Sequence, residues 1–359
     1  DYVDQIFTEF GVDADYYPKN SAEVRALVEL AKRNSIHLYE RKIRHVGSDK
    51  LSKVILNFEN FLEQEGVEIK TNCDVKDIIV RDRKCTGVIT STGEKILANK
   101  VLLAPGRYNA KWMQSLAEKY NLEHEYEKIE VGVRVEFPEE IMRKYAETMY
   151  ESIFVLRTQT YDDLVRTFCP CPRGMVGLET YEGFICVNGH SNSDHNSKNS
   201  NFALVTEIKL TRPVENTTKY AKSIAHLATT IGGGKPVLQR LGDLKKGRRS
   251  TWKRIYRSYI EPSLKEVTPG DISMALPHRV VTNIIEGLTA LDKVMPGIAS
   301  DHTLLYAPEL KFRSSKIKTT KNLETSIQNL FVAGDAAGLS GNIVGAAATG
   351  ILAARGMVK

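Results

Sequence analysis

The fold is decided by the stretch Asn329–Leu–Phe–Val–Ala–Gly–Asp–Ala–Ala–Gly338, which continues as Leu339–Ser–Gly–Asn–Ile–Val–Gly–Ala–Ala–Ala–Thr–Gly350. The pattern predicts a short buried strand from Leu330 to Ala333, a turn at Gly334–Asp335 and a helix of small residues from Ile343 to Ala354. A carboxylate beside a helix N-terminus can accept hydrogen bonds from sugar hydroxyls, while free N–H groups there favour phosphate. The stretch therefore predicts a site for a polyhydroxylated, phosphate-bearing cofactor, and it points to a flavin.

Length and composition set the class of protein. A chain of 359 residues is long enough for a large core and two domains. The net charge of +6 permits an acidic small-molecule partner without requiring nucleic acid. The five cysteines are an odd, sparse set, which fits a reducing interior and predicts a cytoplasmic location. No membrane span is expected, because the apolar helix is shorter than the roughly 20 residues that a bilayer requires.

The first part of the chain reads as half of a dinucleotide-binding α/β domain. Amphipathic helices are predicted at Ser21–Arg33, capped by Ser21, and at Asp49–Glu65, with the glycine Gly66 placed for a C-terminal cap. Short strands are predicted at 67–69, 75–80, 86–90, 95–98 and 100–104. Helix, β-meander and return strand together assign residues 1–125 to this first part.

The sequence pattern changes near Tyr126, where strand-like segments become frequent. Val131, Val133 and Val135 alternate with polar residues and glycine, which predicts a strand buried on one face. Strand-like segments follow, with a helix predicted at Lys219–Thr230. We assign residues 126–300 to an inserted substrate domain and residues 301–359 to the return of the first domain.

The chain lacks the strand–GxGxxG–helix opening that is typical of a dinucleotide-binding domain. Gly232–Gly233–Gly234 does not replace it, because a proline follows at Pro236 and no buried strand precedes it. Two expectations stay open. Either a first βαβ unit lies upstream of Asp1, in the same or a separate chain, or this chain does not hold a dinucleotide.

Several motifs in order along the chain resemble a known family, the uncharacterised FAD-dependent dehydrogenases, also called NAD(FAD)-utilising dehydrogenases. The motifs besides the C-terminal stretch are Arg44–His–Val–Gly–Ser–Asp–Lys–Leu51, Val101–Leu–Leu–Ala–Pro–Gly–Arg107, Val131–Gly–Val–Arg–Val–Glu136, Val165–Arg–Thr–Phe–Cys169, Cys186–Val–Asn–Gly–His–Ser191, Gln239–Arg–Leu–Gly–Asp243 and Pro269–Gly–Asp–Ile–Ser–Met–Ala–Leu–Pro277.

The resemblance implies a fold, a cofactor and a reaction. The fold class is α/β: a discontinuous FAD-binding Rossmann-like domain of the glutathione-reductase type, with its first βαβ unit absent and an α+β substrate domain inserted. The cofactor is FAD, with NAD(P)H as a possible electron partner. The implied activity is that of an FAD-dependent oxidoreductase, a dehydrogenase or reductase, which acts on a small molecule by hydride transfer.

The resemblance also implies where FAD is held. Gly334 and Asp335 match the family's second FAD motif, although an Asp at such a turn can simply cap a helix. Gly341, Asn342 and Ile343 would bring backbone N–H groups to the flavin, and close packing of a small-residue helix is the alternative.

Further cofactor contacts are implied in the first part of the chain. Val75 lies where relatives grip adenine, and a plain core valine is the alternative. A strand-end turn that includes Ala104, Gly106 and Arg107 would lie against the cofactor, or serve only as a turn. Gly47 and Ser48 open a helix, where flavin contact competes with simple capping.

Three candidate catalytic residues lie in the inserted domain: Arg166, Cys169 and His190. A histidine can act as acid or base and a cysteine as nucleophile or redox partner, but each can also be a satisfied structural residue. Cys169–Pro–Cys171 with Cys186, His190 and His195 lacks the spacing of a zinc site, so no metal is expected.

The segment Lys245–Arg257 carries cations interleaved with Trp252 and Tyr256. Cations and aromatic rings together can bind phosphates and stacked bases. It offers an alternative function, a non-catalytic nucleotide- or RNA-binding protein on a degenerate flavin fold. A solvated helix face or an anion site is favoured over this, because the remaining charge is mixed.

Overall fold

The computed structural model describes residues 1–46, 48–125, 128–181, 183–191, 197–211, 216–311 and 316–358. The chain has a mixed α/β architecture and divides into two compact units. Unit 1 comprises residues 1–12, 52–128 and 313–359, and unit 2 comprises residues 13–51 and 129–312. Each unit has its own hydrophobic core.

Unit 1 contains a parallel pair of short strands, β7 (Val101–Leu103) and β19 (Leu330–Val332). Both strands are continuous apolar runs whose residues are wholly or largely buried. Such runs are typical of strands that are covered on both faces. A three-stranded antiparallel meander accompanies the pair, formed by β4 (Val75–Arg81), β5 (Lys84–Thr90) and β6 (Lys95–Leu97).

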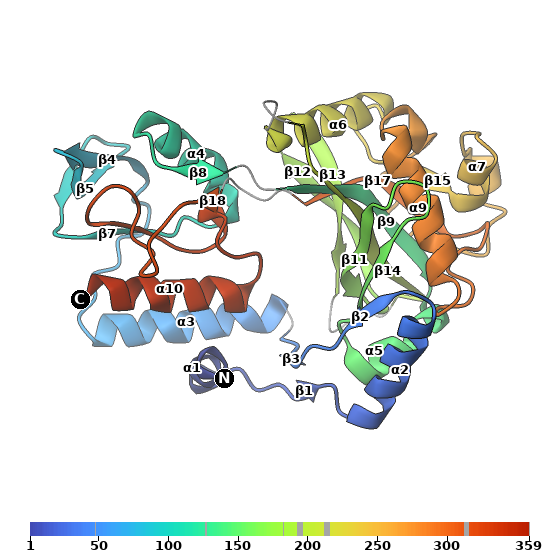
Figure 1. The fold of residues 1–359 in the computed structure, drawn as a ribbon, viewed down its shortest axis with the longest axis horizontal. Helices are drawn as coiled ribbons and strands as arrows, with labels where there is room; N and C mark the ends of the chain where they lie inside the picture. The colour runs from blue at the N-terminus through green and yellow to red at the C-terminus, as the bar shows by residue number, and fades with distance from the viewer. Residues whose placement is uncertain are drawn as a thin grey trace. The chain divides into compact units, whose positions relative to one another are not determined.

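Helices surround these strands in unit 1. The last of them, α10 (Ile343–Met357), follows β19 after a short 3₁₀ turn, and α4 (Ala110–Lys119) contributes Met113 and Leu116 to the core (Figure 1). The remaining elements of this unit are α1 (Tyr2–Glu9), the 3₁₀ turns η1 (Arg107–Asn109) and η4 (Asp335–Ala337), and the strand pair β8 (His124–Glu125) and β18 (Lys316–Ile317). Helix α3 (Ser48–Gln64) begins among the residues of unit 2 and continues into those of unit 1.

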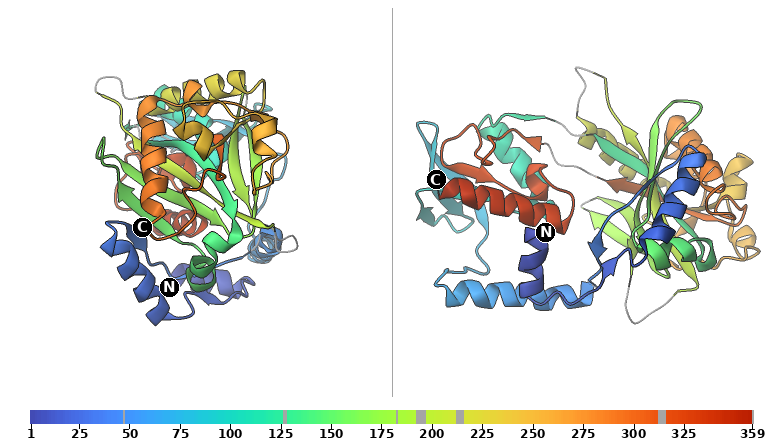
Figure 2. Two further views of the ribbon diagram at one scale, coloured as in Figure 1. Left: turned by 90° about the vertical axis from the view of Figure 1, so that its right-hand side faces the viewer. Right: turned by 60° about the horizontal axis from the view of Figure 1, so that its bottom comes forward.

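Unit 2 is built on a large, mostly antiparallel sheet (Figures 1 and 2). Within the described residues it has eight strands in the order β16-β15-β17-β9-β14-β11-β10-β2. Their bounds in that order are Thr268–Pro269, Val237–Arg240, Leu304–Lys311, Ile129–Pro138, Asn199–Ile208, Leu164–Cys171, Ile153–Arg157 and His37–Tyr39.

The central strand β9 has apolar side chains on one face of the sheet and polar side chains on the other. Val131, Val133, Val135 and Phe137 join the main apolar core, into which α9 (His278–Leu291) also packs. The alternate residues lie on the opposite face of the sheet, which the hairpin of β12 (Met175–Tyr181) and β13 (Phe184–His190) covers. The prediction that only one face of this strand is buried is therefore wrong, because the hairpin buries the polar face as well.

Unit 2 contains further short strands and helices, several of which contribute to its core. They are β1 (Tyr16–Tyr17), α2 (Ser21–Arg33), β3 (Ile43–Arg44), η2 (Glu139–Ile141), α5 (Arg143–Met149), α6 (Thr217–Ile231), α7 (Leu241–Lys245), α8 (Trp252–Ile255) and η3 (Ile272–Met274). The apolar stripe of α2, with Val24, Leu27 and Ala31, is buried as an amphipathic helix requires.

Most predicted elements are confirmed, including α2, α3, α6, α10 and the strands predicted at 75–80, 86–90, 95–98 and 100–104. Two details are wrong. Residues 67–69 form no strand, and the cap of α2 is Asn20, whose side-chain oxygen accepts hydrogen bonds from the N–H groups of Ala22 and Glu23. A side chain one residue before the helix is better placed to satisfy its first N–H groups.

The domain division at residues 125 and 300 stays a prediction. The compact units group two segments differently, because β2 pairs with β10 and β17 pairs with β9, which places residues 13–51 and 301–312 in unit 2. In the part of the chain that the structure describes, no helix is both long and apolar enough to span a bilayer. The cytoplasmic location stays a prediction.

Candidate functional site

Most of the predicted cofactor residues of unit 1, but not Val75, gather at one edge of the parallel pair. Parallel strands end at the same edge, so the turns after β7 and β19 are neighbours. Both turns contain a glycine in the left-handed region, Gly106 with φ of 72° and Gly334 with φ of 76°. Glycine reaches these angles without the steric cost of a Cβ, so the backbone can turn sharply after each of the two strands.

A carboxylate and a guanidinium meet between the two turns. Arg107 Nη2 donates to Asp335 Oδ2 at 3.0 Å, and the Ser340 hydroxyl donates to the other carboxylate oxygen. Arg107 also approaches the carbonyl oxygen of Gly341 at 3.5 Å. The Asp335 side chain is only 19% exposed while that of Arg107 is 57% exposed, so the guanidinium keeps donors directed to solvent.

Helix α10 begins beside these residues. Asn342 caps it, since its side-chain oxygen accepts a hydrogen bond from Gly345 N at 2.7 Å. The N–H of Gly334 donates to the Thr349 hydroxyl at 2.9 Å and so ties the turn to the helix. Capping and close packing thus account for part of this segment, while Gly341, Asn342 and Ile343 are all exposed.

The glycines at this edge leave open surface. A Cβ placed on Gly106, Gly334 or Gly341 would meet no described atom within 4 Å. At Gly356, by contrast, a Cβ would lie 2.5 Å from the Asn322 carbonyl oxygen, so that glycine serves packing. An open edge that carries one carboxylate and one guanidinium fits the pyrophosphate and sugar hydroxyls of FAD.

The other predicted cofactor residues are less informative. Val75 is half-buried and is the first residue of β4. It belongs to the antiparallel meander and not to the parallel pair β7–β19, after which Asp335 lies. Ala104 follows β7 directly and is exposed. Gly47 lies outside the described residues, and Ser48 is described only as the first residue of α3.

A second polar site lies on the buried polar face of the unit 2 sheet. Its centre is Arg134, a fully buried arginine that the sequence reasoning missed. We call it the Arg134 cluster, and it consists of Arg134, Cys169, Cys171, Asn201, Glu309 and Lys311. The arginine donates to Asn201 Oδ1 at 2.7 Å and to the Cys169 carbonyl at 2.7 Å, and its Nη2 lies 3.2 Å from Cys171 Sγ.

A bulge in β11 brings its two cysteines into this cluster. Phe168 pairs with Ala203 but Cys171 pairs with Asn201, so β11 accommodates one extra residue there. Cys169 takes a positive φ of 46°, an uncommon angle for a residue other than glycine. A one-residue shift reverses the faces of a strand, so Cys171 lies on the face that carries Arg134, where regular alternation would have placed Pro170.

The electrostatics of the two thiols differ. The hydrogen bond from Cys171, with the positive charges of Arg134 and Lys311, lowers the pKa of the Cys169 thiol against the opposing effect of burial. The same hydrogen bond, together with burial, raises the pKa of Cys171. The guanidinium of Arg134 contacts the sulfur of Cys171, whereas it meets Cys169 through the backbone carbonyl.

The other predicted catalytic residues lie near this cluster. His190 ends β13 and is exposed, and the adjacent Gly189 packs so closely that a Cβ there would lie 1.7 Å from Arg134 Nη2. Arg166 forms a bidentate ion pair with Glu130, in which Nη2 and Oε2 are 2.6 Å apart. Its charge is already compensated inside unit 2.

Tyr150 and His45 form a further polar pair that no sequence pattern indicated. The tyrosine hydroxyl lies 2.6 Å from His45 Nε2, and Tyr150 has a positive φ of 58°. Burial raises the pKa of Tyr150 to about 12, so the phenol stays protonated at neutral pH. The two residues are 105 positions apart, too far for any local spacing to reveal.

Several cations of the basic segment 245–257 have partners within unit 2. Asp243 is fully buried, accepts a hydrogen bond from Arg248 Nε at 2.8 Å and lies 3.9 Å from Arg254 Nε. Lys245 donates to the Ala299 carbonyl, and Lys246 pairs with Asp301 at 3.4 Å. These partners neutralise or occupy much of the segment, so nucleic-acid binding is not favoured.

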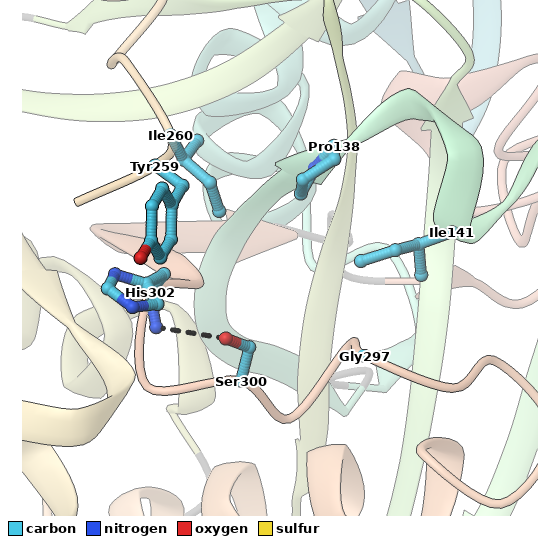
Figure 3. A pocket seen from close by; sticks show the side chains of 7 residues that line it. All are labelled: Pro138, Ile141, Tyr259, Ile260, Gly297, Ser300 and His302. Atoms are coloured by element: carbon cyan, nitrogen blue, oxygen red, sulfur yellow. Dashed lines mark hydrogen bonds between the residues drawn. The ribbon is translucent and has the colours of Figure 1, made fainter.

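A hollow of about 230 Å³ lies elsewhere in unit 2 (Figure 3). It is lined by Pro138, Ile141, Tyr259, Ile260, Gly297, Ser300 and His302. Tyr259 packs edge-on against His302, and burial, reinforced by the charge of Arg240, lowers the pKa of this histidine. The hollow is smaller than the roughly 300 to 1,000 Å³ of typical ligand pockets, and none of the predicted site residues lines it.

Comparison with known proteins identifies a family. Residues 128–312 match the family described as "FAD-dependent protein, C-terminal domain-like". An uncharacterized protein of Clostridium beijerinckii is 27% identical over 350 residues, which cover 89% of this chain and 62% of that protein. The chain therefore spans less than two thirds of the length of this relative.

Solved structures show only weak similarity. An oxidoreductase from Methanosarcina mazei is 13% identical, with a TM-score of 0.35 over 85% of this chain and 53% of that one. GidA from Aquifex aeolicus is also 13% identical, with a TM-score of 0.34 over 96% of this chain and 57% of that one. Scores this low do not assign the fold.

Proposed function

The chain belongs to the family of FAD-dependent proteins whose C-terminal domain it matches at residues 128–312, and from this premise we propose that it is an FAD-dependent oxidoreductase acting on a small molecule. The observation that carries the proposal is the open edge beside Gly106 and Gly334, where Arg107 and Asp335 meet. Bound FAD would supply the chemistry, accepting or donating a hydride.

The protein's own groups would hold the cofactor at this edge. Asp335 would accept hydrogen bonds from sugar hydroxyls, since its carboxylate stands at the open edge beside Gly106 and Gly334. Arg107 would direct its remaining donors to phosphate oxygens. The parallel pair β7–β19 followed by α10 supports a Rossmann-like fold of the glutathione-reductase type for unit 1.

We further propose that Cys169 and His190 are substrate-side groups of unit 2. Their support is the low pKa of the cysteine and the exposure of the histidine. For Arg166, the ion pair with Glu130 supports a role in fixing β11. The Tyr150–His45 hydrogen bond offers a path along which a proton can move.

The visible spectrum of the purified full-length protein tests the proposal. Flavin bands should be present on isolation or appear on titration with FAD, and anaerobic NADH should bleach them if a nicotinamide is the electron partner. A protein that shows no flavin bands after FAD is added would overturn the proposal. If another reductant bleaches the flavin bands but NADH and NADPH do not, only the nicotinamide as electron partner is rejected, and the FAD-dependent function stands.

A further inference from the structure

We propose that unit 2 carries a docking surface for a partner protein, which presents an acidic peptide segment with one aliphatic side chain. We call it the aromatic surface. It consists of the hollow that Tyr259 lines and of three basic and three aromatic residues, Arg249, Trp252, Lys253, Tyr256, Arg257 and Tyr259. The aromatic surface lies wholly in unit 2 and involves no flavin, so it does not depend on the proposed function.

The three aromatic rings of this surface are exposed although each of them is large and mostly apolar. Tyr256 and Tyr259 are 76% and 90% exposed, and Trp252 is exposed as well. Trp252 and Tyr256 stack with their ring centroids 5.5 Å apart, so they form one continuous face. Single exposed apolar residues need no explanation, but contiguous ones mark interaction sites. Tryptophan, tyrosine and arginine are also the residue types that contribute most to binding at protein interfaces.

The basic residues of the surface have charges that the fold does not compensate. Arg249, Lys253 and Arg257 are exposed, and none of them has an ion pair with a residue that the structure describes. The nearest carboxylates on either side along the chain, those of Asp243 and Glu261, are already paired with other cations. Three positive charges beside the rings are therefore complementary to a negatively charged partner.

The hollow gives this surface a pocket for one side chain (Figure 3). Tyr259 forms one wall and packs on His302, with ring centroids 4.6 Å apart. The Ser258 hydroxyl donates to the His302 carbonyl oxygen at 3.2 Å and so holds the basic segment against the hollow. Pro138 and Ile141 contribute apolar walls. A volume of about 230 Å³ is small for a ligand pocket but sufficient for one aliphatic side chain.

The hollow favours an acidic peptide over a single-stranded nucleic acid as the partner. Either of them could use the cations and the rings. A base inside the hollow would bury its hydrogen-bonding edges against Pro138, Ile141 and Ile260, whose side chains offer no hydrogen bond. An aliphatic side chain has no polar group to leave unpaired and gains free energy from the same burial. The partner is therefore a protein.

Fluorescence anisotropy of a labelled peptide tests the aromatic surface in the native full-length protein. The probe is a short peptide of glutamate and aspartate with one central leucine, and it should bind saturably at low salt. Replacing this leucine by glycine should weaken binding by about tenfold, because burial of the side chain is lost. Absence of saturable binding, or equal binding of the glycine peptide, would overturn the proposal. Tighter binding of an oligouridine of the same length would overturn it in favour of a nucleic acid.

Matched variants locate the binding on the protein. Arg257→Gln should weaken the peptide by about threefold to fivefold, because it removes one uncompensated charge. Arg25→Gln changes an exposed arginine of α2 in the same unit and should leave the affinity unchanged. Tyr259→Ala should weaken the peptide by about tenfold, whereas Tyr39→Ala, at an exposed tyrosine of β2, should not. All four side chains are exposed, so the variants should keep the fold, which circular dichroism checks. Equal effects of a variant and its control would overturn the proposal.

Discussion

The guanidinium of Arg107 and the carboxylate of Asp335 are joined by a hydrogen bond of 3.0 Å although 228 positions separate them. The bond links the turn after β7 to the turn after β19. Two parallel strands thus bring together the charged groups that would face the cofactor.

Asp335→Ala should weaken FAD binding by about 10- to 100-fold, because charge-assisted hydrogen bonds contribute about 1.5 to 3 kcal/mol. Fluorescence titration of the full-length protein with FAD measures the effect. The matched control is Asp77→Ala, because the Asp77–Lys119 pair of the same unit has nearly the same exposure, 20% and 56%, as the Asp335–Arg107 pair, 19% and 57%. Equal loss of affinity in both variants would show that the effect is not specific to the edge.

Gly189→Ala should destabilise unit 2 by about 2 to 3 kcal/mol, the cost of overpacking a filled core. Its Cβ would lie 1.7 Å from Arg134 Nη2, which is buried and hydrogen-bonded and so cannot move cheaply. Denaturant unfolding measures the change.

Gly177→Ala, on the partner strand β12, is the control for this effect. Its Cβ would lie 2.0 Å from the ring of His190, but this exposed ring can rotate away. We expect a loss below about 1 kcal/mol. Comparable losses in the two variants would contradict a rigid Arg134 cluster.

The Asp163–Arg279 ion pair should make stability depend on pH in acid. Two bonds of 2.6 Å from Arg279, with a further bond from Asn283, hold the pKa of the Asp163 carboxyl below its usual value. A lowered pKa stabilises the fold above the unfolded value near 4, and this contribution is lost as the pH falls through the folded value. The stability difference between wild type and Asp163→Asn should therefore be largest above about pH 5 and shrink below pH 4.

Asp162→Asn provides the control, since the neighbouring carboxylate pairs with Arg157 at 3.3 Å on an exposed surface. Exposed pairs contribute at most about 1 kcal/mol, so this variant should change the pH profile little. Thermal melts from pH 3 to 7 compare the variants, and a pH-independent loss in Asp163→Asn would refute the assignment.

Arg248→Gln should cost about 1 to 3 kcal/mol of stability, because it leaves the buried carboxylate of Asp243 without its main charged partner. Arg257→Gln, in the same basic segment, should cost less than about 0.5 kcal/mol. Urea unfolding separates the two. If the two variants lost equal stability and both also lost RNA retention in a filter assay, the nucleic-acid function would be favoured instead.

The sequence by itself determined the local structure and the types of residue at the cofactor edge. Apolar periodicity located α2 and α3. The run Leu330–Ala333, the turn at Gly334–Asp335 and the small residues that follow predicted β19, its turn and α10. These features depend on neighbours along the chain, which a sequence displays directly.

Only the tertiary structure decided which polar groups meet. Arg107 with Asp335, Tyr150 with His45, and Arg134 with two cysteines and Glu309 all lie far apart in sequence. No local period encodes such contacts, because strand pairing and a single bulge in β11 set them. The hairpin β12–β13 likewise buries a face of β9 that alternation alone assigned to solvent, since alternation reports side-chain direction and not what covers it.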